Sequence, residues 1–111
     1  MRRDRDRLTD IIEAIGKIRE RLPPAPEELM ESELLQVWVI HHLQVIGEAA
    51  NNLSPALIAA HPEIPWQRVI GLRHVLVHRY FGVDLAIVWQ LATDDLPALE
   101  ASVRAILEGS T

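Results

Sequence analysis

The stretch SELLQVWVIHHLQVIGEAANNL, residues 32–53, does most to decide the fold of this chain. Its apolar residues do not alternate as in a half-buried strand, and on a helix they occupy more than one side. Four polar positions, His41, Gln44, Glu48 and either Asn51 or Asn52, recur at three- and four-residue spacing and predict one polar stripe. A helix this apolar must be covered on two faces, so we expect its own bundle on one face and a partner chain on the other.

The sequence before and after this stretch predicts further helices. An apolar stripe at 3-4-3-4 spacing ends at Pro23, and its members are Leu8, Ile11, Ile15, Ile18 and Leu22. Ser54-Pro55 is typical of an N-cap followed by proline at the first helical position, and it predicts a short helix that ends near His61.

The second half of the chain continues the helical pattern. Pro65 is expected to start a helix that Gly82 ends, and Asp84 to cap the next one. Pro97 lies inside the last apolar stripe and implies a kink or a fresh helix start near Thr93 and Asp94. We therefore predict a single all-α domain over residues 1–111, a bundle of four long helices plus one or two short ones.

Composition narrows the functional classes. The 111 residues suit one domain, and 49% of them are hydrophobic. The chain has no cysteine, which excludes disulfides, thiolate metal sites and a cysteine nucleophile. Its first residues lack the apolar core of a signal peptide, and no apolar run approaches the roughly 18 residues of a membrane span. A cytoplasmic protein is the simplest interpretation.

Charge is distributed unevenly along the chain. The formal net charge is −5, but residues 65–81 contain Arg68, Arg73 and Arg79 and no Asp or Glu. Since phosphate affinity comes from local arginine and lysine, this window is the candidate surface for RNA, with Arg68 and Arg79 as possible contacts.

Histidines in the same window suggest a chemistry. His74 and His78 are four residues apart and share a helical face, a spacing that can also bind zinc. The flanking Arg73 and Arg79 repel a metal ion and favour a phosphate instead, so we expect no metal and no cofactor. A histidine that exchanges a proton near neutral pH, next to an arginine that binds a phosphodiester, is the minimum for metal-free RNA cleavage.

Two considerations keep a structural interpretation open. The arginines, histidines and Tyr80 could instead cap helix carbonyls or pair with Glu48 or Asp84. On a regular helix Arg73 and His78 also point about 140° apart. For both to reach one phosphate, the helix must loosen near His78, Arg73 must reach round the axis, or a second chain must complete the site.

The segment Arg73–Tyr80, RHVLVHRY, resembles the R-x-x-x-x-H-x-Y signature of HepT-type toxins of the HEPN superfamily. The resemblance extends to other blocks from about Arg7 to Leu107. These are Glu33–Gln36, Ile46–Ala50, His61–Trp66, Tyr80–Asp84, Ile87–Trp89 and Asp95–Pro97. Arg79 departs from the family pattern, in which a small residue is frequent, and adds a cation.

This resemblance implies a homodimeric HEPN-type bundle that acts as a metal-independent endoribonuclease on cellular RNA. Arg73 and His78 take the catalytic positions and His74 a supporting polar position. Apart from the resemblance, Glu48 is a candidate to pair with these side chains. The resemblance also implies that the chain is the toxin of a type VII toxin–antitoxin system. In such a system a minimal nucleotidyltransferase, the antitoxin, would neutralise it by AMPylation of Tyr80. The alternative is a non-catalytic HEPN dimer that serves as binding partner, substrate or antidote of the nucleotidyltransferase.

Overall fold

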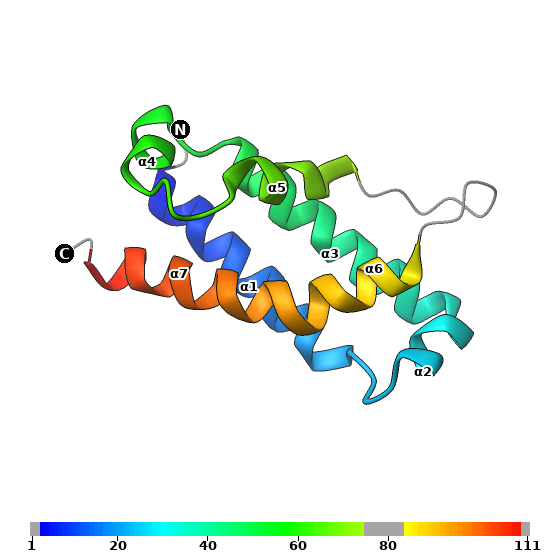
Figure 1. Ribbon diagram of the computed structural model, residues 1–111. Helices are drawn as coiled ribbons and strands as arrows, with labels where there is room; N and C mark the ends of the chain where they lie inside the picture. The colour runs from blue at the N-terminus through cyan, green and yellow to red at the C-terminus, as the bar shows by residue number, and fades with distance from the viewer. Residues whose placement is uncertain (1–2, 75–83, 110–111) are drawn as a thin grey trace.

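The computed structural model describes residues 3–74 and 84–109, which contain helices and turns and no strand (Figure 1). The predicted all-α bundle is therefore confirmed. Its elements are α1 (Asp4–Arg21), α2 (Pro26–Glu31), α3 (Glu33–Asn51), α4 (Pro55–Ala60), α5 (Trp66–Gly71), the 3-10 turn η1 (Leu72–His74), α6 (Leu85–Gln90), the π-helical turn η2 (Leu91–Asp95) and α7 (Leu96–Gly109).

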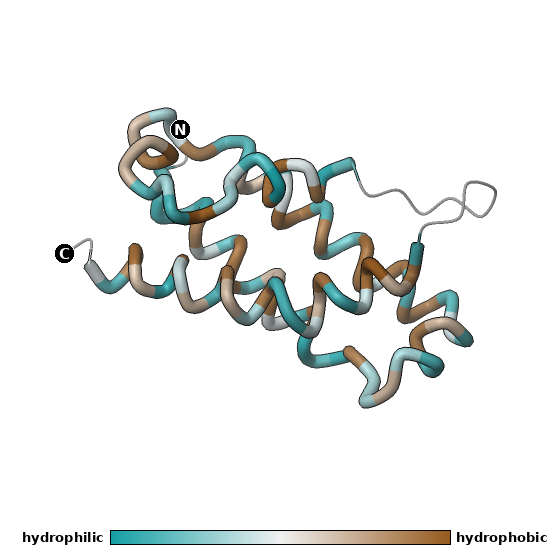
Figure 2. The backbone as a smooth tube through the Cα atoms, viewed as in Figure 1, coloured by the Kyte–Doolittle hydropathy of each residue, from teal (hydrophilic) through white to brown (hydrophobic). Residues whose placement is uncertain are grey.

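Helix α3 lies at the centre of the bundle. It contacts α1, α5, η1, α2 and α6, while α7 packs on the other side of the bundle against α1 (Figure 1). The inward residues Val39, Ile40, Leu43 and Ile46 are almost completely buried. Figure 2 shows hydrophobic segments recurring between hydrophilic ones along α1, α3 and α7, as expected for helices with one face in a core. Among the described residues, no helix combines the length and hydropathy that crossing a membrane requires.

Short-range signals set the helix ends. The Oγ atoms of Ser32 and Ser54 accept hydrogen bonds from the backbone N–H groups of Leu35 and Leu57, both at 3.2 Å. Asp84 Oδ1 accepts from the N–H of Ala86 at 3.0 Å and caps α6. Each cap satisfies an N–H group that has no partner inside the helix. The predicted starts of α3, α4 and α6 are thereby confirmed.

Pro97 produces the predicted irregularity. It is the second residue of α7, and the turn before it, Leu91–Asp95, is π-helical. Proline has no N–H to donate to the carbonyl of Thr93, and its ring would collide with that carbonyl in a regular α-helix. The wider turn removes the collision, so α6, η2 and α7 run on as one irregular helix.

The expected fourth long helix, from Pro65 to Gly82, is described only in part. Residues 66–71 are α-helical, and the helix tightens into the 3-10 turn at Leu72. Residues 75–83 lie outside the described residues, and with them lie His78, Arg79 and Tyr80.

Candidate functional site

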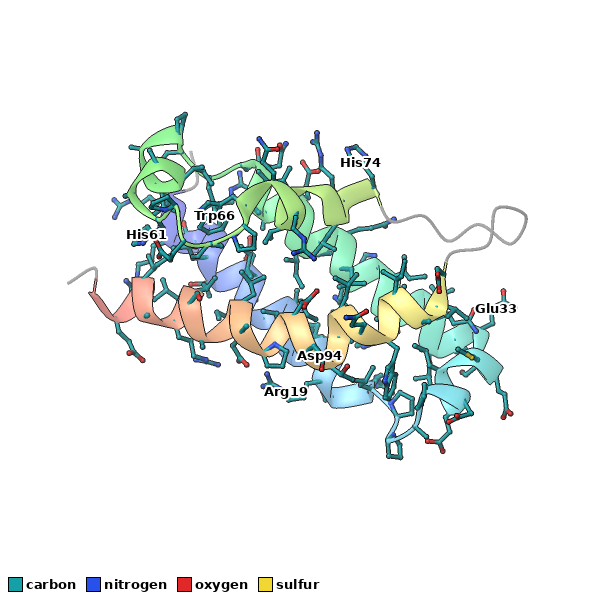
Figure 3. All side chains as sticks on the ribbon, in the orientation of Figure 1. Arg19, Glu33, His61, Trp66, His74 and Asp94 are labelled. Atoms are coloured by element: carbon teal, nitrogen blue, oxygen red, sulfur yellow. The ribbon has the colours of Figure 1, made fainter. Side chains whose placement is uncertain are left out.

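Arg73 and His74 lie at the end of the described part of the α5–η1 segment. Arg73 is half-buried and His74 is exposed. Figure 3 shows the His74 side chain on the outer side of η1, away from α7. Residues Leu72–His74 form a 3-10 turn, so the described start of the interval from Arg73 to His78 does not have the α-helical geometry on which the separation of about 140° was based.

The backbone of η1 rests directly on α3 at Gly47. A Cβ atom added to Gly47 would lie 2.2 Å from the Arg73 nitrogen, 2.9 Å from the Arg73 Cα and 2.8 Å from the Leu72 carbonyl carbon. No side chain fits in that space, so only glycine permits this approach. Gly47 was not predicted as a site residue, because a single glycine inside a helix does not show which backbone lies against it.

The Arg73 side chain has an unsatisfied donor. Its Nε atom is buried and has no hydrogen-bond partner among the described residues. A guanidinium group has five N–H donors and no acceptor, and leaving a buried donor unpaired costs free energy. Arginine binds phosphate oxygens well, but this Nε atom is closed to solvent, so a phosphate would have to meet another part of the guanidinium.

Glu48 and Asp84, the carboxylates considered as partners, make other contacts. Glu48 is exposed and accepts a hydrogen bond from the side chain of Asn52 at 3.2 Å. Asp84 Oδ1 is engaged in the cap of α6. Pairing of Glu48 with the arginine or histidine side chains of the site stays a prediction.

Arg68 is exposed on α5 and lines a cleft of about 310 Å³ between α5–η1 and η2–α7. The cleft has mostly aliphatic walls, and Glu63 and Asp95 line it together with Arg68. Two carboxylates make this space unfavourable for a phosphate. Arg68 thus lies beside two carboxylates, and its contact with RNA stays a prediction.

The remaining histidines lie elsewhere. His42 is buried on α3 and packs edge-on against Trp38, with the ring centroids 4.6 Å apart. Burial, then the charges of His41 and Lys17, lower the pKa of His42 from its ordinary value of 6.5. His61 Nδ1 lies 3.5 Å from the Glu63 carboxylate, and the His61 carbonyl accepts a hydrogen bond from Trp66 (Figure 3). Within the described residues, no group of three or more His, Asp or Glu could hold a metal ion.

Comparison with known proteins places this arrangement in a family. A family model described as "Ribonuclease HepT-like" matches residues 11–106, which run from the middle of α1 through most of α7 and include the whole Arg73–Tyr80 segment. The chain belongs to the HepT-like ribonuclease family. The predicted family membership is thereby confirmed.

Individual relatives of this HepT-like chain agree with that assignment. It is 38% identical over 106 residues to "Probable ribonuclease HepT" of Thermococcus cleftensis, which covers 95% of this chain and 96% of the relative. It is 29% identical over 100 residues to a "Putative RNase" of Methanocaldococcus jannaschii, covering 89% and 92% of the two chains. A "Putative RNase" of Caldanaerobacter subterraneus subsp. tengcongensis is 34% identical over 82 residues, covering 74% and 73%. No solved structure matches the chain.

Proposed function

We propose that this chain is an endoribonuclease that cleaves RNA without a metal ion, with Arg73 and His78 as its catalytic residues. The observation that carries the proposal is the placement of Arg73. Its backbone lies against Gly47 of α3, which gives the start of this cationic side chain a defined place at the end of η1. The membership of the chain in a family described as ribonucleases supports RNA cleavage in general.

The reaction needs one proton acceptor and one cation. In the proposed step His78 takes the proton of an RNA 2′-hydroxyl, and that oxygen attacks the adjacent phosphorus. The bond from phosphorus to the 5′-oxygen breaks, the leaving oxygen takes a proton from water, and the protonated His78 returns its proton to the solvent. The products are a 2′,3′-cyclic phosphate and a free 5′-hydroxyl. Arg73 binds the phosphate oxygens and stabilises the negative charge that develops on them.

A homodimer is part of this proposal. Four large apolar side chains are exposed on α2, α3 and α6, namely Met30 (49%), Leu34 (84%), Val37 (41%) and Ile87 (55%). Leu34 and Val37 are three residues apart on α3 and share its outer face. Adjacent exposed apolar residues of this kind are typical of protein interfaces, and a second copy is the partner that the sequence suggested.

In the cell we propose that the chain is the toxin of a type VII toxin–antitoxin pair. The antitoxin, a minimal nucleotidyltransferase, transfers AMP from ATP to the hydroxyl of Tyr80 and releases pyrophosphate. Tyr80 is two residues from His78 in the sequence. The added phosphate would neutralise the nearby cations and occupy the place of an RNA phosphate.

RNA cleavage by the purified chain tests the proposal. Wild type, incubated with RNA in EDTA and without ATP, should produce fragments that end in a 2′,3′-cyclic phosphate. His78→Ala and Arg73→Ala should each slow cleavage about a hundredfold or more. His61→Ala is the matched control, since it removes an imidazole far from the proposed site. Cleavage by His78→Ala at the wild-type rate would contradict the mechanism, and complete loss in EDTA would favour a metal enzyme.

If neither wild type nor any variant cleaves RNA, the non-catalytic alternative gains support. Separate expression of the chain and of a neighbouring nucleotidyltransferase then decides between a toxin and a substrate or antidote. Growth arrest caused by the nucleotidyltransferase alone would reverse the proposed roles.

A further inference from the structure

Gly47 is in close contact with the segment that carries Arg73. The three nearest atoms to its missing Cβ are all backbone atoms of Leu72 and Arg73, at 2.2, 2.8 and 2.9 Å. Backbone atoms cannot turn aside as the end of a flexible side chain can. Adding one methyl group at position 47 must therefore move either α3 or η1.

The core determines which of the two moves. The residue before Gly47, Ile46, is 0% exposed, and Leu43, one turn earlier, is also 0% exposed. Helix α3 is held on several sides by α1, α2, α5 and α6. The turn η1 is only three residues long, and Leu72 is its single buried residue. The shorter and less constrained element should give way, so a Cβ at position 47 displaces η1.

Displacement of η1 acts directly on Arg73. The closest atom, at 2.2 Å, is the nitrogen of Arg73 itself, and its Cα lies at 2.9 Å. A shift or rotation at these atoms changes the direction of the Cα–Cβ bond, and a long side chain enlarges that change at the guanidinium. Gly16 and Gly71 differ in this respect, because a Cβ added to either would have no atom within 4 Å.

We infer that Gly47 is a positioning residue for RNA cleavage, setting the place of the Arg73 guanidinium by letting η1 rest on α3. This inference rests on the proposed function, in which Arg73 binds the reacting phosphate. Gly47 itself has no side chain and touches no substrate. Its contribution is the close approach of two backbones, and it acts only through Arg73.

The test compares Gly47→Ala with Gly71→Ala, the matched control two residues before Arg73. Single-turnover cleavage separates two quantities, the fraction of protein that is active and the rate constant of the active protein. Misplacement of a catalytic group by about 1 Å can cost up to a hundredfold in rate, so Gly47→Ala should cleave about ten- to a hundredfold more slowly at full amplitude. Gly71→Ala should cleave at the wild-type rate. Reduced amplitude with an unchanged rate constant would mean a purely structural role and would overturn the inference.

A second measurement does not depend on cleavage. Affinity for an oligonucleotide with 2′-deoxy nucleotides, which the proposed reaction cannot cleave, is measured for Gly47→Ala, Arg73→Ala and the double variant. If Gly47 acts through Arg73, the double variant should bind as weakly as Arg73→Ala alone. Fully additive losses would overturn the inference. If wild type does not cleave RNA, the proposed function fails, while this cycle still reports whether Gly47 acts through Arg73.

Folding of Gly47→Ala is checked by helical circular dichroism, and sucrose is added if the variant is unstable. Failure to fold even in sucrose would make Gly47 a folding residue and would overturn the positioning role.

Discussion

Asp4 and Ser54 join the first turn of α1 to the start of α4. The backbone N–H of Ser54 donates to Asp4 Oδ1 at 2.8 Å, and the Ser54 hydroxyl donates to Asp4 Oδ2 at 2.5 Å. The same Ser54 oxygen accepts the capping hydrogen bond from Leu57 at 3.2 Å. One side chain thus serves a local cap and a contact between two distant segments.

Ser54→Ala should therefore destabilise the protein more than loss of a cap alone. Removing a cap costs about 1 kcal/mol, and a hydrogen bond to a charged group adds about 1.5 kcal/mol or more. Ser32→Ala is the matched control, since Ser32 makes a capping bond of the same 3.2 Å length to Leu35. Urea unfolding gives the free energy of unfolding of each variant. Equal losses for the two variants would contradict the contribution of Asp4.

His42 should make stability fall as the pH falls below neutral. Burial lowers the pKa of His42 below 6.5, and His41 and Lys17 add to the effect. Above the unfolded-state pKa both states hold a neutral imidazole, so His42 has no influence there. As the pH drops through 6.5 toward the lower native pKa, the unfolded state binds the proton first, and native stability is lost. His42→Phe keeps a ring beside Trp38 but cannot bind a proton. In this variant the free energy of unfolding should change less between about pH 7 and pH 5 than in wild type.

The control for that measurement is His61→Ala, which removes a half-buried histidine that lies outside the contact between His42 and Trp38. If His42→Phe retains the wild-type pH dependence, another group is responsible.

Arg68 should contribute to RNA binding mainly through its charge. It is exposed on α5, five residues before Arg73 in the sequence. The logarithm of the binding constant falls as the logarithm of the salt concentration rises. Removing one arginine–phosphate contact makes this slope less steep by about 0.7 for single-stranded nucleic acid. Arg68→Ala should show this change for RNA and leave the cleavage rate of bound RNA nearly unchanged. Arg3→Ala, at the start of α1, serves as the control. An unchanged salt slope in Arg68→Ala would remove Arg68 from the RNA surface.

Tyr80 should be the acceptor of AMP. Coexpression with the nucleotidyltransferase should raise the mass of the chain by one or more AMP groups and abolish RNA cleavage. Tyr80→Phe lacks the hydroxyl, so it should keep its unmodified mass and stay active in the presence of the antitoxin. An unmodified wild-type chain beside an active nucleotidyltransferase would rule out this form of regulation.

The helix starts and the irregular turn were predictable because they depend on residues within about one turn of each other. Ser32, Ser54 and Asp84 cap the helices that follow them, and Pro97 distorts the turn before it. The R-x-x-x-x-H-x-Y segment was recognisable from its own spacing and from the blocks around it. These features are local, so the sequence by itself determined the all-α class, most helix boundaries and the family.

Contacts between separate elements could not be predicted in this way. Three findings depend on how α1, α3, α4 and η1 meet in space: Gly47 lies against Arg73, Asp4 contacts Ser54, and His42 is buried. Residue spacing along one helix defines its faces but not what packs on each face. Only the tertiary structure decided that the candidate phosphate-binding arginine has its backbone against a glycine of the central helix, because that contact joins two elements far apart in the chain.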